Sequence, residues 1–275
     1  MTSLRIAFCY LHDFLAATHA VWLREVLRML RDSGQIVGAF SRPVLWVMIF
    51  GIGLTPYFRT GLRETTFMVP FPYIQFILPA VVVLNLMYPA IQSAVSLIWD
   101  RVFGFSREVF ASPTPRSAVF LGKLLGGSTI AMFQGLVVMI LLPAANVPVS
   151  YASLSAALVP MMTVALAFTA IGLFLASRMS SFQGFGVFAN TLILPAFFLA
   201  SSIFPLDPSL SMEQALQSFP AWLVFLVHAN PVTYAIDELR WAMLGYRQFD
   251  PVTARAVLSA FVIIPVLMAY YVFRR

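Results

Sequence analysis

Six long apolar segments, separated by short polar stretches, constrain the fold of this chain more than any other feature of its sequence. A helix needs about 20 apolar residues to cross a bilayer, so six crossings use roughly 120 residues. The rest of the 275-residue chain is too short and too divided for a soluble domain of ordinary size. Only 10% of the residues are charged, against about a quarter in an average soluble domain. The sequence therefore predicts an all-α integral membrane protein with six transmembrane helices, at about residues 36–54, 73–99, 119–142, 154–176, 185–204 and 256–273.

Lysine and arginine are unevenly distributed between the two sides that six spans would create. Twelve of the seventeen fall on the side of the two termini, in residues 5–42 and 101–123, at Arg178 and at the C-terminal pair. Because positively charged loops stay inside, we expect both termini in the cytoplasm and the protein in a bacterial cytoplasmic (inner) membrane. Topology thus explains the net charge of +6, which does not indicate a nucleic-acid partner. The five cations on the other side are Arg59, Arg63, Arg240, Arg247 and Arg255.

The residues before the first span predict an amphipathic helix from about Phe14 to Asp32, with Gly34 as its stop. A basic amphipathic helix lies in the membrane interface, where its cations meet anionic headgroups. Two interpretations stay open: an anchor that only sets topology, or an elbow that also contacts a cytoplasmic subunit. The apolar face holds Leu23, Val26, Leu27 and Leu30, and the polar face holds Arg24, Glu25, Arg28 and Arg31.

The one conspicuous polar stretch between spans covers residues 100–116, on the predicted cytoplasmic side. It is too charged to be buried in lipid and too apolar for a plain solvated loop. We interpret it as a short helix along the membrane, ended by Pro113 and Pro115, that docks a separate motor protein. The alternative is an interfacial loop that only anchors its two spans. The residues assigned to docking are Phe103, Phe105, Arg107, Glu108 and Phe110.

Signatures of catalysis are missing from the sequence. Gly122-Lys123 has neither the upstream glycine nor the following hydroxyl of a phosphate-binding loop. The three histidines are not spaced with carboxylates or cysteines as metal ligands, and no serine lies in a G-x-S-x-G motif. The single cysteine, Cys9, excludes an intrachain disulfide. We therefore expect this chain to be no enzyme and to bind no cofactor or metal of its own.

The interiors of the predicted spans contain almost no ionisable side chains. Ion-coupled transporters usually keep an Asp, Glu or His at membrane depth, so the sequence favours a path for amphipathic or hydrophobic cargo. The strongly polar side chains, Gln134 among them, could equally form hydrogen bonds between helices. The residues assigned to a cargo path are Asn85, Tyr88, Gln92, Asn190, Phe197 and Phe198, each of which could instead be a core or lipid-facing residue.

The segment before the last span predicts two short helices on the outer side. Residues 219–226 form an apolar run, Asn230 is a suitable cap and Pro231 suits the first turn of a second helix. That helix continues through Tyr234 to a stop at Gly245, and Asp237 and Arg240 can pair on one of its faces. Neither helix can cross a bilayer. We expect a re-entrant hairpin that closes the outer end of a path, or else a lid on the headgroups.

Two of these stretches together resemble the signatures of the ABC-2 type exporter permeases, the membrane subunits of drug, polysaccharide and lipid exporters. Residues 100–123 resemble the family pattern of Gly, Arg-Glu, Ser/Ala-Pro, Arg and Gly-Lys, and residues 230–240 (NPVTYAIDELR) resemble the second signature. The six spans and basic amphipathic start fit as well, so the resemblance covers nearly the whole chain. One departure is residues 200–205 (ASSIFP), where many relatives have a Ser-Gly pair.

The resemblance implies a dimer of permeases, from two copies or with a sister permease, paired with two separate ATP-binding subunits that carry ATP and Mg. Residues 1–35 would form the connecting helix, residues 103–110 the coupling helix, and residues 36–275 the transmembrane domain. The second and fifth spans of the two copies would face each other around the export path. A membrane scaffold without transport and an ATP-independent carrier remain alternatives. The cargo, whether drug, lipid or glycan, stays open.

Overall fold

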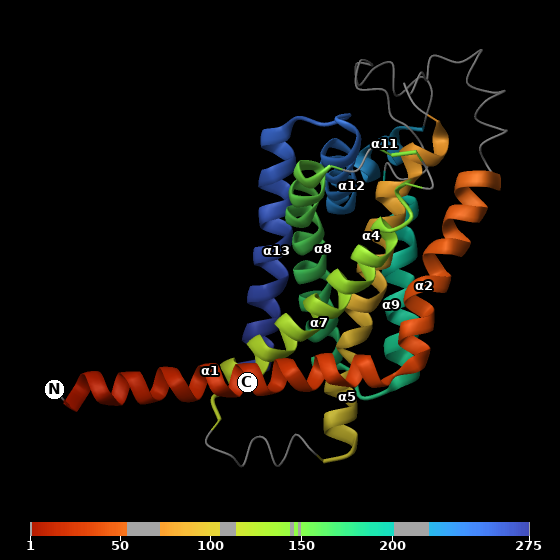
Figure 1. Ribbon diagram of the computed structural model, residues 1–275. Helices are drawn as coiled ribbons and strands as arrows, with labels where there is room; N and C mark the ends of the chain where they lie inside the picture. The colour runs from red at the N-terminus through yellow and green to blue at the C-terminus, as the bar shows by residue number, and fades with distance from the viewer. Residues whose placement is uncertain are drawn as a thin grey trace.

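The computed structural model describes residues 2–53, 72–104, 114–143, 146–147, 150–200 and 220–274 of the chain. All regular elements in these ranges are helical, and α1 lies across one end of a bundle formed by the others (Figure 1). We call this the α1 end and the opposite one the α12 end. The elements are α1 (Thr2–Arg31), α2 (Ser33–Trp46), the π-helix η1 (Val47–Gly53), α4 (Tyr73–Ser93), α5 (Val95–Val102), α7 (Arg116–Met139), α8 (Tyr151–Arg178), α9 (Phe182–Phe198), α11 (Ala221–Ala229), α12 (Pro231–Leu244) and α13 (Pro251–Arg274).

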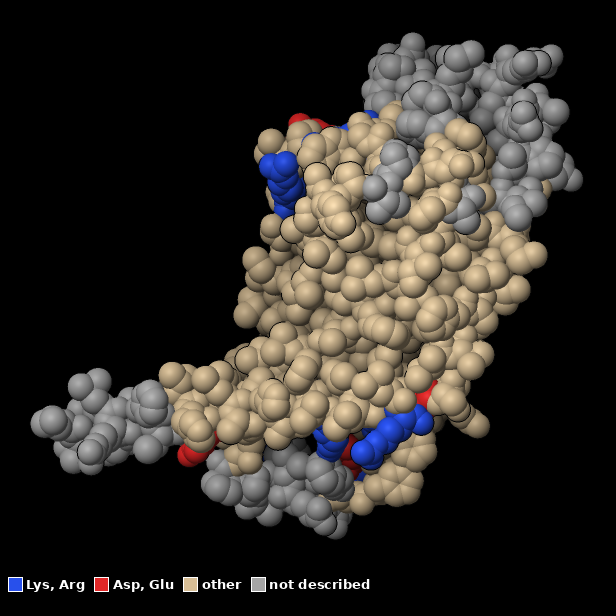
Figure 2. Space-filling view, in the orientation of Figure 1, with Lys and Arg blue, Asp and Glu red and all other residues tan. Residues whose placement is uncertain are grey.

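Four helical segments in the described ranges are long and apolar enough to cross a membrane. Another helix, α9, is apolar but has only 17 residues. On the face drawn in Figure 2, charged side chains lie toward the two ends and the middle of the bundle shows none. The protein is therefore a multi-pass membrane protein. The four segments are Tyr73–Val102, Arg116–Met139, Tyr151–Arg178 and Pro251–Arg274.

The core of the bundle is built around α4. In the most apolar part of the α4–α5 segment, 83% of the residues are buried, against 17% for α13. Helices α7, α8, α9 and α12 all pack against α4, whereas α13 packs mainly on α8 and turns its other side outward. A central helix with apolar residues all round is what a buried position requires, since no side of it meets lipid.

Glycines on α7 allow close helix packing. A Cβ on Gly126 would lie 2.8 Å from Cβ of Glu25 on α1. A Cβ on Gly127 would lie 2.6 Å from Cγ2 of Thr169 on α8. Small residues let two backbones approach closely in membranes. Helix α7 thus packs tightly against α1 on one side and against the core on the other.

Three helix boundaries differ from the sequence prediction. Helix α1 begins at Thr2 rather than near Phe14, because residues 2–13 contain no glycine or proline to stop it. Gly34 does not end it, since the break falls at Asp32, whose side chain caps α2 by accepting the Gln35 N–H at 3.2 Å. The second predicted span, at residues 73–99, continues through Pro79 and Pro89 but breaks at Ala94, between α4 and α5.

Candidate functional site

A network of buried charges ties three helices together at the α1 end. Lys123 on α7 donates to Glu25 of α1 at 2.9 Å and to the Ser96 hydroxyl of α5 at 2.9 Å, and it lies 2.7 Å from Oδ2 of Asp100. Arg24 of α1 contacts Glu25 at 3.0 Å and Asp100 at 2.9 Å. The side chain of Lys123 is only 2% exposed and that of Glu25 only 5%. Two cations therefore neutralise two carboxylates where water is largely excluded.

The charges in this network support one another. Burial alone would raise the pKa of Glu25, but Lys123 and Arg24 outweigh burial and leave that pKa below its ordinary value. Burial would likewise lower the pKa of Arg24, but Asp100 and Glu25 leave it above its ordinary value. Both side chains of α1 are thus held in their charged forms at neutral pH.

Further contacts fasten α1 and α5 to the bundle. Trp22 of α1 donates its indole N–H to Thr129 of α7 at 3.1 Å. Arg101 of α5 donates to the last carbonyls of α8, those of Ala176 and Ser177, at 3.1 and 2.9 Å. A cation at a helix C-terminus satisfies carbonyls that lack partners within the helix. Helix α5 is therefore held from both sides, by α1 through charges and by α8 through a cap.

Of the five docking residues, Phe103 is described, while Phe105, Arg107, Glu108 and Phe110 lie outside the described residues. Phe103 ends α5, is 70% exposed and stacks on Trp99 with ring centroids 5.0 Å apart. Gly104 follows with φ of 78°, a backbone conformation that suits glycine. An exposed aromatic at a helix end is a candidate contact for a partner.

The three connecting-helix arginines have different surroundings. Arg24 belongs to the charge network. Arg28 is exposed and stands over the Trp99 ring, 5.9 Å from its centroid. Arg31 is exposed in the last turn of α1. Only one of the three is thus committed to an ion pair with a described residue.

The α12 end has the local structure that the sequence predicted. Asn230 caps α12 by accepting the Val232 N–H at 3.0 Å, Pro231 occupies the first turn and Gly245 ends the helix with φ of 69°. The Asn230 amide also donates to the Ala196 carbonyl of α9 at 2.6 Å. One residue therefore caps α12 and attaches it to the last turn of α9.

Polar groups inside the α12 end bind mainly to the chain that follows α12. Asp237 accepts the backbone N–H groups of Gln248 and Phe249 at 2.7 and 3.1 Å. Arg240 is fully buried, donates to the Gln248 side chain at 2.7 Å and lies 3.8 Å from the Phe76 ring centroid on α4. Tyr234 donates to the His228 carbonyl at 2.8 Å. The sequence placed Asp237 and Arg240 on one helix face, and their contacts meet at residues 248–249.

The residues assigned to a cargo path are divided between core and surface. Asn85 is buried and donates to the Val81 carbonyl of its own helix at 2.9 Å. Phe197 is fully buried, while Phe198 is 38% exposed and packs edge-on against it. Gln92 and Asn190 are exposed, on α4 and α9, and Tyr88 is half-buried beside Arg42. The structure does not gather these six residues into one site.

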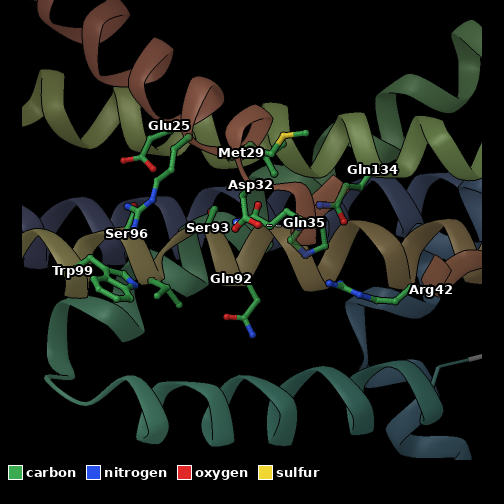
Figure 3. A pocket seen from close by; sticks show the side chains of 14 residues that line it. Glu25, Met29, Asp32, Gln35, Arg42, Gln92, Ser93, Ser96, Trp99 and Gln134 are labelled. Carbon is green, nitrogen blue, oxygen red and sulfur yellow. Dashed lines mark hydrogen bonds between the residues drawn. The ribbon is translucent and has the colours of Figure 1, made fainter. Parts of the chain in front are cut away.

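A polar cleft of about 420 Å³ opens between α1, α2, α4, α5 and α7 (Figure 3). Gln92 is the one cargo-path residue on its wall. Gln134 of α7 and Arg42 of α2 also line it, and Arg42 lies within α2 rather than before the first span, where the count of charges had placed it. In the described part of the chain, no group of His, Cys, Asp or Glu is arranged to hold a metal ion.

Comparison with known proteins decides the family. The model of the ABC-2 type transporter family matches residues 16–244, more than four fifths of the chain. The chain belongs to the ABC-2 type transporter family. The inner membrane transport permease YadH of Escherichia coli K12 is 26% identical to it, over 96% of this chain and 97% of its own length.

More distant ABC-2 relatives match over shorter stretches or at lower identity. Nodulation protein J of Rhizobium leguminosarum is 22% identical, over 93% of both chains. The ycf38 protein of the alga Pyropia yezoensis is 23% identical, over 86% of this chain and 77% of its own. The protein is thus an ABC-2 family transport permease.

Sequence reasoning missed the charge network of this ABC-2 permease. Lys123 was interpreted as part of a failed phosphate-binding motif and of the family's Gly-Lys pattern, and Asp100 as the start of the polar stretch, but neither was given a partner. The partners are 76 residues apart for Arg24 and Asp100 and 98 residues apart for Lys123 and Glu25. The one available signal was a lysine, Lys123, inside an otherwise apolar predicted span, because such a charge needs a partner.

Proposed function

We propose that this permease is the membrane subunit of an ATP-driven exporter, and that a separate ATP-binding subunit docks at the α1 end. The subunit would carry ATP and Mg, and the permease would provide the path. Both termini and residues 105–113 would then face the cytoplasm, as the distribution of Lys and Arg indicates.

The charge network at the α1 end carries this proposal. Residues 105–113 connect α5 to α7, and the network joins these same two helices to α1 through Lys123. A partner that moves the connecting segment would therefore displace α1, α5 and α7 together. Arg101 extends the attachment to α8. Force applied at one loop thus has a continuous route of charge-assisted contacts into the bundle.

We propose six spans, with α2 and η1 as the first and α9 as the fifth. Helix α9 would be about 26 Å long at 1.5 Å per residue, close to the bilayer core of about 30 Å. Helices α11 and α12 would form the re-entrant hairpin at the outer side, fastened to α9 by Asn230. Its two helices have 9 and 14 residues, too few to cross.

A second permease, as an identical copy or a sister chain, would complete the path. Helix α9, the proposed fifth span, leaves side chains exposed and would face its counterpart across the path, as the family resemblance implies. The path would be lined there by Asn190 and Phe198, both exposed on α9. The exposed apolar residues of α9 include Val187 and Phe188.

Affinity purification from the native membrane in mild detergent tests the proposal. We expect a stoichiometric ATP-binding subunit to co-purify, and Arg107→Ala with Glu108→Ala to reduce its recovery and the cargo-stimulated ATP hydrolysis. The control is Arg178→Ala, which removes an exposed cation at the same end. Transport without any ATPase would indicate a carrier, and a folded permease with neither ATPase nor transport would indicate a scaffold.

A further inference from the structure

The polar cleft at the α1 end contains two arginines that form no ion pair with a described residue. Its walls come from five helices and carry two arginines, two carboxylates and three glutamines. Such a concentration of polar groups is unusual beside helices of a membrane protein, where each buried polar group needs a partner. The polar lining residues are Glu25, Arg28, Asp32, Gln35, Arg42, Gln92, Ser93, Ser96 and Gln134.

Both carboxylates of the cleft are already engaged by the protein. Glu25 belongs to the charge network, whose two cations and two anions cancel. Asp32 caps α2 and also accepts the side-chain amide of Gln35 at 3.1 Å, which Figure 3 draws as a dashed line. Outside the network, Asp32 is the one carboxylate among the described wall residues that opposes the two arginines, and these residues carry an excess of one positive charge.

The two arginines retain most of their hydrogen-bonding capacity. Among the described residues, no carboxylate lies within ion-pair distance of Arg28 or Arg42. Each guanidinium stands over an aromatic face instead, Arg28 at 5.9 Å from the Trp99 centroid and Arg42 at 5.8 Å from that of Tyr88. An aromatic face orients a guanidinium and leaves its N–H groups free for an anion.

Gln134 supplies an independent sign of a missing ligand. Its side chain is on the cleft wall and only 3% exposed, and its Oε1 is buried with no hydrogen-bond partner among the described residues. A buried unpaired amide oxygen costs about 1–3 kcal/mol. Gln134, Gln35 and Arg42 line the same cleft, and Figure 3 labels all three around it. The amide can satisfy an O–H of a bound group or, with its O and N exchanged, donate to one.

We propose that this cleft binds the phosphate-class headgroup of an anionic membrane amphiphile. Two guanidinium groups and an amide match a phosphate, which accepts bidentate hydrogen bonds from arginine. Met29, Ile130 and Trp99 add apolar surface to the wall, and the neighbouring face of α2 exposes Val37, Phe40 and Val44 toward lipid. An amphiphile would thus place its charge between the arginines and its chains along α2.

The location in the cytoplasmic leaflet rests on the proposed function, whereas headgroup binding itself does not. The amphipathic α1 would lie in the membrane interface, so the cleft between α1 and the apolar α2 would be at the depth where headgroups meet acyl chains. Inorganic phosphate has no apolar part that could contact the apolar residues of the cleft wall. The amphiphile is therefore favoured over inorganic phosphate.

Native mass spectrometry of the purified permease, with any ATPase that accompanies it, tests the proposal in neutral detergent. The probe is dioctanoyl phosphatidic acid, and dioctanoyl phosphatidylcholine and inorganic phosphate are the comparisons. We expect Arg28→Gln with Arg42→Gln to weaken phosphatidic acid binding at least tenfold, and Gln134→Met to weaken it several-fold. The matched control, Arg178→Gln with Arg274→Gln, removes two exposed cations from the same end and should change binding less than twofold.

Equal binding of phosphatidylcholine, equal loss in the control variant, or unchanged binding in the cleft variant would each overturn the proposal. If inorganic phosphate displaced phosphatidic acid at an equal concentration, the preference for an amphiphile over a free anion would be overturned. Arg28→Lys with Arg42→Lys keeps the charge without the bidentate geometry and should bind with intermediate affinity, which guards against a misfolded glutamine variant. Binding is measured without ATP hydrolysis, so failure here leaves the exporter proposal intact, and loss of ATPase co-purification leaves this one intact.

Discussion

The two ends of the bundle both contain buried charges, but the partners of these charges lie at very different distances along the chain. At the α1 end, side chains from α1, α5 and α7 pair with one another across long sequence separations. At the α12 end, Asp237 accepts backbone N–H groups only 11 and 12 residues away, and Glu238 forms an ion pair at 2.9 Å with Arg247, nine residues away. The pairs at the α1 end join different helices, whereas those at the α12 end attach α12 to the residues that directly follow it. The comparison suggests that helices move together at the α1 end, whereas the α12 end holds the chain after α12 in place.

The largest effect should come from breaking the network at its most buried member. Lys123→Met leaves Glu25 and Asp100 with a single cation, and an uncompensated buried charge costs about 3–5 kcal/mol. The free energy of unfolding in SDS-containing mixed micelles measures this. Adding Glu25→Gln to the variant should recover about 1 kcal/mol, because it removes the stranded charge. Equal stability of wild type and Lys123→Met would mean that the network does not hold α1 in place.

A smaller but still large loss is expected at the α12 end. Asp237→Asn keeps the shape but cannot accept well from both Gln248 and Phe249, at a cost of about 2–3 kcal/mol. The same unfolding assay applies, and ATPase recovery should remain at the wild-type level. Asp13→Asn, at a carboxylate that is 78% exposed, is the control and should change stability by about 0.5 kcal/mol or less. A loss of ATPase recovery in Asp237→Asn would contradict the assignment of the two ends.

The smallest expected loss of stability is that of Arg24→Gln, and its dependence on salt concentration distinguishes the two ends. Arg24 is 36% exposed, so Arg24→Gln should cost only about 0.5–1 kcal/mol. High salt screens exposed charges, so the difference from wild type should shrink at 1 M ionic strength, where the Debye length is about 3 Å. The loss in Asp237→Asn should be the same at both salt concentrations. If the stability loss in Arg24→Gln did not change with salt concentration, the charges at the α1 end would be as shielded from solvent as those at the α12 end.

The two ends also differ in how far the sequence predicted them. The ends of α12 depend only on residues that are close in the sequence, so they could be predicted without the fold. These residues are the cap Asn230, the proline after it and the stop at Gly245. The partners of Lys123 depend on how α1 crosses α7, which no local pattern encodes. The six apolar segments predicted the membrane class for a similar reason, since the bilayer imposes length and composition on each helix separately.

Where local rules competed, tertiary packing decided the outcome. Proline usually interrupts a helix, but α4 continues through Pro79 and Pro89 because neighbouring helices enclose it. Phe197 and Asn85, assigned to a path by residue type, are buried in the core. Residue type alone does not reveal which side of a helix faces a neighbour.

The single residue between α1 and α2 has a mechanical consequence. Asp32 joins the two helices without a loop, and the Asp32 N–H and carbonyl bond to Met29 and to Ile36. Helix α1 is thus a rigid arm on a short hinge, gripped by α7 near Val21. The arm extends about 28 Å beyond that grip, at 1.5 Å per residue, so a tilt of about 10° would move its tip by roughly 5 Å. A slight rotation of α1 about its contact with α7 would therefore become a displacement of its tip about as wide as one helix turn.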